Sequence, residues 1–241
     1  MNKSKIEWCD YTWNPVTGCL HDCPYCYAAK ITKRFGGGKA WDRGSCHGEN
    51  LHVLFTKPET PYPYYFEPTF HKYRLDEPSE IKKPKNIFVC SMADLFGDWV
   101  PDEWIKQVFD ACKKAPQHRY LFLTKNPKRY YDYLYEREMP DNFWFGTTIT
   151  NDKTDFFWSN KNKTFISIEP LQSDFKIHQE NRLLSDWVII GAETGNRKGK
   201  IIPKLEWIDN IISECGRNNV PIFMKDNLKE ICGGLIQEFP W

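Results

Sequence analysis

The sequence predicts a single α/β domain over residues 1–241, a partial or degraded (β/α) barrel of the TIM type with a parallel sheet. Short β-branched or aromatic runs recur along the chain, and each ends abruptly in polar residues. Near-continuous apolar runs of this length suit strands that are buried on both faces of a parallel sheet. Stretches with a helical apolar period separate several of these runs, and alternating strands and helices are typical of a parallel βα series.

The predicted strands follow one pattern along the chain. A strand-like stretch at Tyr11–Thr17 comes first, and later runs cover residues 86–90, 120–123, 143–145, 165–168, 187–190 and 221–224. About six or seven such units indicate a barrel or a partial barrel. Because functional groups gather at the carboxyl ends of the strands in a parallel barrel, we expect the polar residues that end the runs to share one rim.

Helices are predicted between several of the strands, over residues 101–112, 126–135 and 204–216. In the first of them, Trp104, Val108 and Cys112 share one apolar face. The connections after residues 150 and 170 are short for full helices, so we expect a degraded barrel rather than an ideal one. A stretch at about 36–80, rich in Pro, Tyr and His, is predicted to be a long insertion between the first and second units.

The composition excludes several classes of protein. Lys and Arg number 33 against 32 Asp and Glu, so no overall charge points to a nucleic acid or a membrane as partner. The first ten residues lack the apolar region of a secretory signal, and the longest apolar run, Trp187–Ala192, is too short to span a bilayer. Six of the nine cysteines are scattered singly, which favours a reducing compartment over a disulfide scaffold. We therefore expect a cytoplasmic protein with no membrane partner.

Three cysteines form the one close set in the sequence. Cys19, Cys23 and Cys26 have the spacing C-x3-C-x2-C. Structural zinc takes four protein ligands, usually as two pairs, and here a second pair is missing, so His21 or Cys9 would have to serve. A cubane [4Fe–4S] cluster can use three thiolates and leave its fourth iron open. The spacing favours the cluster; the alternative is a zinc-stabilised nucleic-acid-binding protein without catalysis.

The cysteine loop and several longer blocks carry a resemblance. C-x3-C-x-aromatic-C, with Tyr25 as the aromatic residue, resembles the cluster loop of the radical S-adenosylmethionine (SAM) enzymes, and it lies after the first predicted strand and before a helical run at 28–35. The chain further resembles a phage-associated three-cysteine-motif family of unknown function. The matching blocks are T-W-N-P-V-T-G-C, I-F-V-C-S-M-A-D-L-F, L-F-L-T-K-N-P-K-R, F-I-S-I-E-P-L, D-W-V-I-I-G-A-E-T-G and V-P-I-F-M-K. The chain departs from many relatives in its compact first cysteine spacing and in Cys90, where they often carry Asn.

The resemblance implies a cofactor set and a reaction. SAM would bind the open iron of a [4Fe–4S] cluster, and its reductive cleavage would give a 5′-deoxyadenosyl radical that abstracts a hydrogen atom from the substrate. An external flavodoxin- or ferredoxin-like protein would donate the electron. We expect a nucleotide or nucleic acid as substrate, in a lyase or nucleic-acid-modifying reaction, because of the phage association and because basic and aromatic residues interleave in the predicted insertion.

The residues that the resemblance implies for SAM follow the predicted strands. Ser91 and Asp94 could meet the SAM ammonium, Lys125, Thr147 and Thr148 its carboxylate or ribose, and Glu169 and Glu193 the ribose or the substrate. Each has a simpler interpretation, as a helix cap, a solvated flank, a β-prone residue or a turn. Cys90 could donate a hydrogen atom to a substrate radical, as a cysteine does in a related radical SAM DNA-repair enzyme. We interpret His21 as a spacer in the loop or a neighbour of the ligands, and Cys112 and Cys215 as core residues.

Overall fold

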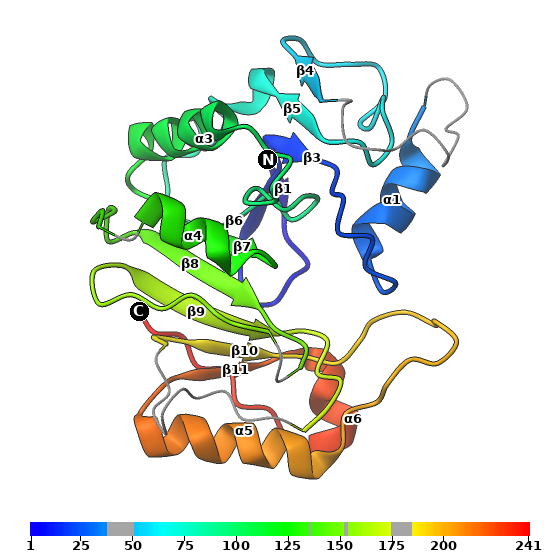
Figure 1. Ribbon diagram of the computed structural model, residues 1–241, viewed down its shortest axis with the longest axis vertical. Coiled ribbons are helices and arrows are strands. Elements are labelled where there is room, and N and C mark those ends of the chain that lie inside the picture. The colour runs from blue at the N-terminus through cyan, green and yellow to red at the C-terminus, as the bar shows by residue number, and fades with distance from the viewer. Residues whose placement is uncertain (38–50, 135, 152–153, 175–184) are drawn as a thin grey trace. The chain divides into compact units, whose positions relative to one another are not determined.

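The computed structural model describes residues 1–37, 51–134, 136–151, 154–174 and 185–241. The chain divides into two compact units, Met1–Arg129 and Tyr130–Trp241. Figure 1 labels the main elements of both units. The single domain predicted from the sequence stays a prediction.

The first unit is built on parallel strands. Its strands β2 (Tyr11–Trp13), β6 (Asn86–Val89) and β7 (Arg119–Thr124) pair in parallel in this order, and the short β1 (Asn2–Lys3) pairs with β2 antiparallel. The buried residues of β6 and β7 explain the apolar runs in the sequence, because both faces of these strands are covered.

A second, three-stranded sheet corrects the prediction of the first strand. The stretch Tyr11–Thr17 is divided into β2 and β3 (Val16–Thr17), and β3 pairs antiparallel with β5 (Thr69–His71) instead of continuing β2. β4 (His52–Leu54) pairs parallel with β5 on its other side. Pro15 stands between β2 and β3, and a proline has no backbone N–H to continue a ladder.

Helices of the first unit follow the predicted pattern. α3 (Asp102–Lys114) confirms the helix expected at 101–112, and its apolar face is buried. α1 (Tyr27–Phe35) follows the cysteine loop, and residues 72–80 form the short η2 (Lys72–Arg74) and α2 (Glu77–Glu80). α4 (Pro127–Leu134) contains the boundary between the units. Residues 38–50 of the predicted insertion lie outside the described residues.

The described part of the second unit contains four parallel strands. They are, in order across the sheet, β8 (Phe143–Thr148), β9 (Lys163–Ile168), β10 (Val188–Ile190) and β11 (Ile222–Met224). The described part of the connection from β8 to β9 contains no helix, as expected from its length, and the connection after residue 170 falls partly on 175–184, outside the described residues. α5 (Leu205–Asn218) joins β10 to β11, and η3 (Asp226–Leu228) and α6 (Lys229–Cys232) follow β11.

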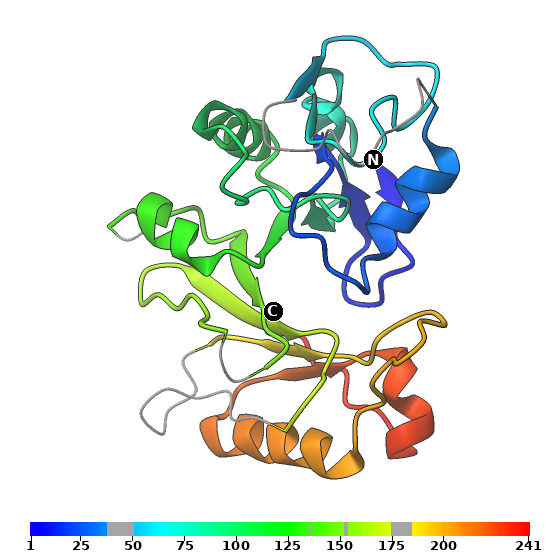
Figure 2. The ribbon, with the colours of Figure 1, turned by 45° about the vertical axis from the view of Figure 1, so that its right-hand side comes forward.

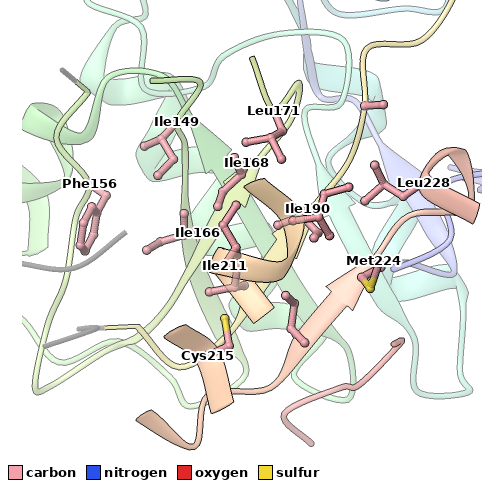
Figure 3. Packing of buried hydrophobic residues seen from close by; sticks show 14 residues of the cluster. Ile149, Phe156, Ile166, Ile168, Leu171, Ile190, Ile211, Cys215, Met224 and Leu228 are labelled. Carbon is pink, nitrogen blue, oxygen red and sulfur yellow. The ribbon is translucent and has the colours of Figure 1, made fainter. Parts of the chain in front are cut away.

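The core of the second unit lies between its sheet and α5. Figure 2 shows α5 lying along one side of these strands, and Figure 3 shows Ile211 and Cys215 of α5 facing Ile166 and Ile190 of the sheet. Cys215 is 1% exposed, and Cys112 in α3 is 0% exposed, so both are core residues as predicted. Burying an isoleucine side chain such as that of Ile211 stabilises the fold by about 1.5–3 kcal/mol.

These strands confirm the predicted fold class. The fold is α/β with a mostly parallel sheet, and the described strands do not close into a barrel, since the strand order ends at β1 and at β11. In the part of the chain that the structure describes, no helix combines the length and the apolar character needed to cross a membrane.

Candidate functional site

The cysteine loop leaves β3 through a glycine that no other residue could replace without strain. Gly18 has a φ of +86°, and a Cβ there would lie 2.2 Å from the carbonyl oxygen of Glu67. Its N–H donates to the carbonyl of Met92 (2.9 Å), and the N–H of Cys19 donates to the carbonyl of Phe66 (3.1 Å). The loop therefore begins at a fixed position beside the carboxyl end of β6.

The loop ends where α1 begins. Cys26 caps this helix, and its Sγ accepts a hydrogen bond from the N–H of Ala29 at 3.4 Å. The N–H of Cys26 donates to the carbonyl of Cys23 (3.0 Å), which makes a tight turn between the two cysteines. A helix N-terminus favours negative charge, so this position suits a thiolate ligand.

The three thiols lie within electrostatic reach of one another. Burial raises the pKa of Cys19 to about 12, and the charges of Asp94, Cys26 and Cys23 act in the same direction. Burial also raises the pKa of Cys23, while the Lys125 ammonium and a hydrogen bond from the Tyr25 side chain oppose this rise. A metal would therefore have to displace protons from Cys19 and Cys23 at neutral pH.

These residues fit the donor set of an iron–sulfur cluster. Among the described residues, no three His, Cys, Asp or Glu side chains are gathered closely enough to hold a single metal ion. A cubane has a different requirement, because each thiolate binds a separate iron. Beside the loop, the buried indole N–H of Trp99 has no acceptor among the described residues, and its ring lies edge-on to His21 with the centroids 4.9 Å apart. A bound group with acceptor atoms would relieve the cost of this unpaired donor.

Asp94 has several partners within the protein. Its carboxylate accepts hydrogen bonds from His21 Nε2 (2.7 Å), the Thr124 hydroxyl (2.7 Å), and the backbone N–H groups of Lys125 (2.8 Å) and Phe96 (3.0 Å). Burial by itself would raise the pKa of Asp94, but the hydrogen bonds and the charge of His21 outweigh it and leave the pKa below its ordinary value. The side chain that the sequence suggested for the SAM ammonium thus joins the cysteine loop to the ends of β6 and β7.

Ser91 lies in the turn after β6 and is held by residues that sequence reasoning did not single out. Its hydroxyl donates to Asn14 Oδ1 (3.2 Å), which also accepts from the N–H of Met92 (2.9 Å). The Tyr27 hydroxyl of α1 donates to the Ser91 carbonyl (2.5 Å). Asn14 belongs to the T-W-N-P block of the resemblance, and this block was the available signal for its role.

Cys90 has a positive φ of 60° at the end of β6 and is 2% exposed. Burial raises the pKa of Cys90 to about 12, although its thiol hydrogen-bonds the backbone of Val16. The charge of Cys90 also acts on Cys112, a core residue of α3. The Cys90 thiol therefore lies in the interior of the first unit.

In the second unit, the predicted threonines end β8. Thr147 is 0% and Thr148 4% exposed, and the Thr147 hydroxyl accepts a hydrogen bond from the N–H of Phe157 (3.1 Å). This bond fastens the β8–β9 connection against the end of its own strand.

Glu169 follows β9 and forms an ion pair with a lysine that sequence reasoning missed. Lys225 Nζ lies 2.5 Å from Glu169 Oε1, and Lys225 is only 8% exposed although it follows the last strand. The lysine side chain passes over Gly191, where a Cβ would come within 2.9 Å of Lys225 Cδ. The polar K-D-N stretch after the last apolar run was a signal for this residue.

Glu193, after β10, is 3% exposed and is paired within its own loop. Arg197 Nε and Nη2 donate to its two carboxylate oxygens, both at 2.7 Å. Beside it, Asn227 exchanges hydrogen bonds with the backbone of Ala192, at 3.0 and 2.8 Å. The ends of β9, β10 and β11 thus carry polar side chains that are paired with one another or with the backbone.

The structure brings the predicted residues together in two sets, one in each unit. Around the cysteine loop of the first unit lie Cys19, Cys23, Cys26, Ser91, Asp94 and Lys125, whereas Cys90 is buried at the end of β6. Thr147, Thr148, Glu169 and Glu193 lie at strand ends of the second unit. A rim shared by both sets stays a prediction.

Comparisons with known proteins identify a family and a fold. A family model described as "Protein of unknown function (DUF5131)" matches residues 3–230. No curated protein matches the sequence. Among solved structures, a mutant of spore photoproduct lyase has a TM-score of 0.54 and 12% identity, over 92% of this chain and 78% of that one. The same enzyme complexed with dinucleoside spore photoproduct has a TM-score of 0.53, with the same identity and coverage. This likeness shows a shared fold.

Proposed function

We propose that this chain, which belongs to the DUF5131 family, is a radical SAM enzyme. The observation that carries the proposal is the loop of Cys19, Cys23 and Cys26, whose thiols are close enough to interact electrostatically. Beside this loop lies the buried indole N–H of Trp99, which has no acceptor among the described residues. The shared fold supports the proposal, because spore photoproduct lyase is a radical SAM enzyme. The phage association of the narrower resemblance stays a prediction.

Different residues would bind the cluster and SAM. Cys19, Cys23 and Cys26 would hold a [4Fe–4S] cluster, which with SAM would supply the reductive cleavage that yields a 5′-deoxyadenosyl radical. Lys125, whose charge acts on Cys23, would offset the negative charge of the thiolates or of the SAM carboxylate. Ser91 would orient the turn after β6 toward SAM. Asp94 would hold His21 and the backbone at Lys125 in position beside the cysteines.

The second unit would supply the remaining polar contacts. Glu169, which forms an ion pair with Lys225, would accept hydrogen bonds from ribose or substrate hydroxyls. We propose Thr147 and Thr148 for the carboxylate or ribose of SAM, and Glu193 for the ribose or the substrate. Thr147 and Glu193 also have partners within the protein, and these bonds would hold the strand ends in position.

We propose a nucleotide or nucleic acid as substrate and a lyase or modifying reaction. Support comes from spore photoproduct lyase, which has been solved with dinucleoside spore photoproduct. The first unit also exposes aromatic rings, one of them beside a lysine, which suits base stacking next to phosphates. Phe55 is 70% exposed with Lys72 Nζ 5.0 Å from its ring centroid, and Tyr64 is 39% exposed and stacks on the His52 ring with centroids 3.6 Å apart. A flavodoxin- or ferredoxin-like electron donor and a cytoplasmic location remain predictions.

Cys90 as hydrogen-atom donor also stays a proposal, and its burial sets a condition on it. The thiol would reach a substrate only after the turn at residues 90–91 moves. Unchanged turnover and product in Cys90→Ala would rule out this role.

Anaerobic reconstitution with iron and sulfide tests the cofactor directly. We expect a brown protein with about four irons per chain, and loss of colour and iron in Cys23→Ala. Cys232→Ala is the matched control, because Cys232 lies in α6 of the other unit. A colourless protein with one zinc ion per chain would contradict the proposal and support the zinc-stabilised nucleic-acid-binding alternative.

A further inference from the structure

His21 lies in the three-residue segment between Cys19 and Cys23 and contacts two residues far from it in the sequence. Its Nε2 lies 2.7 Å from Asp94 Oδ2, across 73 positions of sequence. Its ring lies edge-on to the Trp99 ring, at an interplanar angle of 78°. A residue that served only as a spacer would have neither contact.

The Asp94 side of this arrangement is a rigid acceptor. The carboxylate is buried, and its other hydrogen bonds come from Thr124 at the end of β7 and from Phe96 and Lys125, which follow β6 and β7. The strand ends fix these donors, so they fix the carboxylate as well. Through His21, the middle of the cysteine loop is therefore tied to the first unit's sheet.

The Trp99 side is fixed by packing. A Cβ at Gly97 would come within 2.3 Å of the Trp99 ring, so the indole lies directly on the backbone at Gly97. At Asp22, next to His21, the chain takes a positive φ of 49°, a conformation that Asp tolerates better than most residues. This turn and the two contacts leave the His21 ring little freedom.

We propose that His21 is a positioning residue for the cluster: it holds the loop between Cys19 and Cys23 in the conformation that presents their thiols. This inference rests on the proposed function. Without the His21 ring, the segment from Leu20 to Asp22 would lose both its hydrogen bond to Asp94 and its contact with the Trp99 ring. Groups that hold metal ligands in place typically contribute 10–100-fold to metal affinity, so the loss should be measurable.

The test compares reconstituted His21→Ala, His21→Gln and wild-type protein. The rate at which an iron chelator removes the cluster without oxygen and the electron paramagnetic resonance spectrum of the reduced cluster are both measured. We expect His21→Ala to lose its cluster about 10–100-fold faster and to change the spectrum. His21→Gln, whose amide can still donate to Asp94, should restore much of the wild-type behaviour. Leu20→Ala, at an exposed neighbouring position, is the matched control and should behave like wild type.

The melting temperature of each metal-free protein separates positioning from folding. We expect similar melting temperatures for Leu20→Ala, His21→Gln and wild type. Release rates and spectra in His21→Ala equal to those of wild type would overturn the inference while leaving the proposed function intact. Equal acceleration in Leu20→Ala would overturn it too, because any change in the loop would then have the same effect. A wild-type chain that takes up no cluster would overturn both.

Discussion

At the scale of single residues, the partners of the site come from distant parts of the chain. Asp94 joins the loop at His21 to the ends of two strands, and Asn14 holds the turn at Ser91. The sequence identified Asp94 and Ser91 by their position after a predicted strand. It could not show that Asp94 binds His21, because such a pairing depends on how the strands are brought together and leaves no local pattern.

His71 gives a prediction at this scale. Its ring is buried, with Nε2 2.8 Å from the Thr17 hydroxyl and Nδ1 3.2 Å from the Tyr73 hydroxyl. Burial, and then the charge of Arg74, lowers the pKa of His71 from 6.5 to about 3. As the pH falls between these two values, the unfolded chain binds a proton that the native protein does not. The free energy of unfolding should therefore fall, by up to about 1.4 kcal/mol per pH unit.

Chemical denaturation of wild type and His71→Gln between about pH 7 and pH 4 measures this contribution. The variant keeps a polar group that can bond to Thr17 but has no proton to gain, so its stability should depend less on pH. Parallel pH profiles of the two proteins would show that His71 is not excluded from protonation in the native state.

At the scale of secondary-structure elements, the apolar pattern predicted most of the sheet. The runs at 86–90, 165–168 and 187–190 are strands, because a strand buried on both faces is apolar at nearly every position. The pattern failed at Tyr11–Thr17, where both halves are apolar enough for a strand but Pro15 separates two sheets. Apolar periodicity reports burial, and it does not report which strand is the partner.

α5 carries a prediction at this scale, because its apolar face closes the core of the second unit. Ile211 is 2% exposed and faces the sheet in Figure 3, so Ile211→Ala would leave a cavity. We expect a loss of about 2–5 kcal/mol in the free energy of unfolding, measured by chemical denaturation. Ser213→Ala, at an exposed position of the same helix, should change it by less than about 0.5 kcal/mol. Equal losses in both variants would contradict this packing of α5.

At the scale of the whole molecule, the proposed radical SAM function depends on the three-thiol loop of the first unit. The parallel strands and the likeness to spore photoproduct lyase show a shared fold. The fold class could be predicted because few architectures are compatible with apolar strand-like runs that alternate with helices. The Lys225–Glu169 pair could not, because it joins residues 56 positions apart.

The formation of 5′-deoxyadenosine shows directly whether this chain cleaves SAM by radical chemistry. Reconstituted protein is reduced with dithionite under anaerobic conditions, given SAM, and the products are separated and identified. We expect wild type to produce 5′-deoxyadenosine and methionine, and Cys23→Ala to produce neither. A wild-type protein with a full, reducible cluster that leaves SAM intact would contradict the claim that this chain is a radical SAM enzyme.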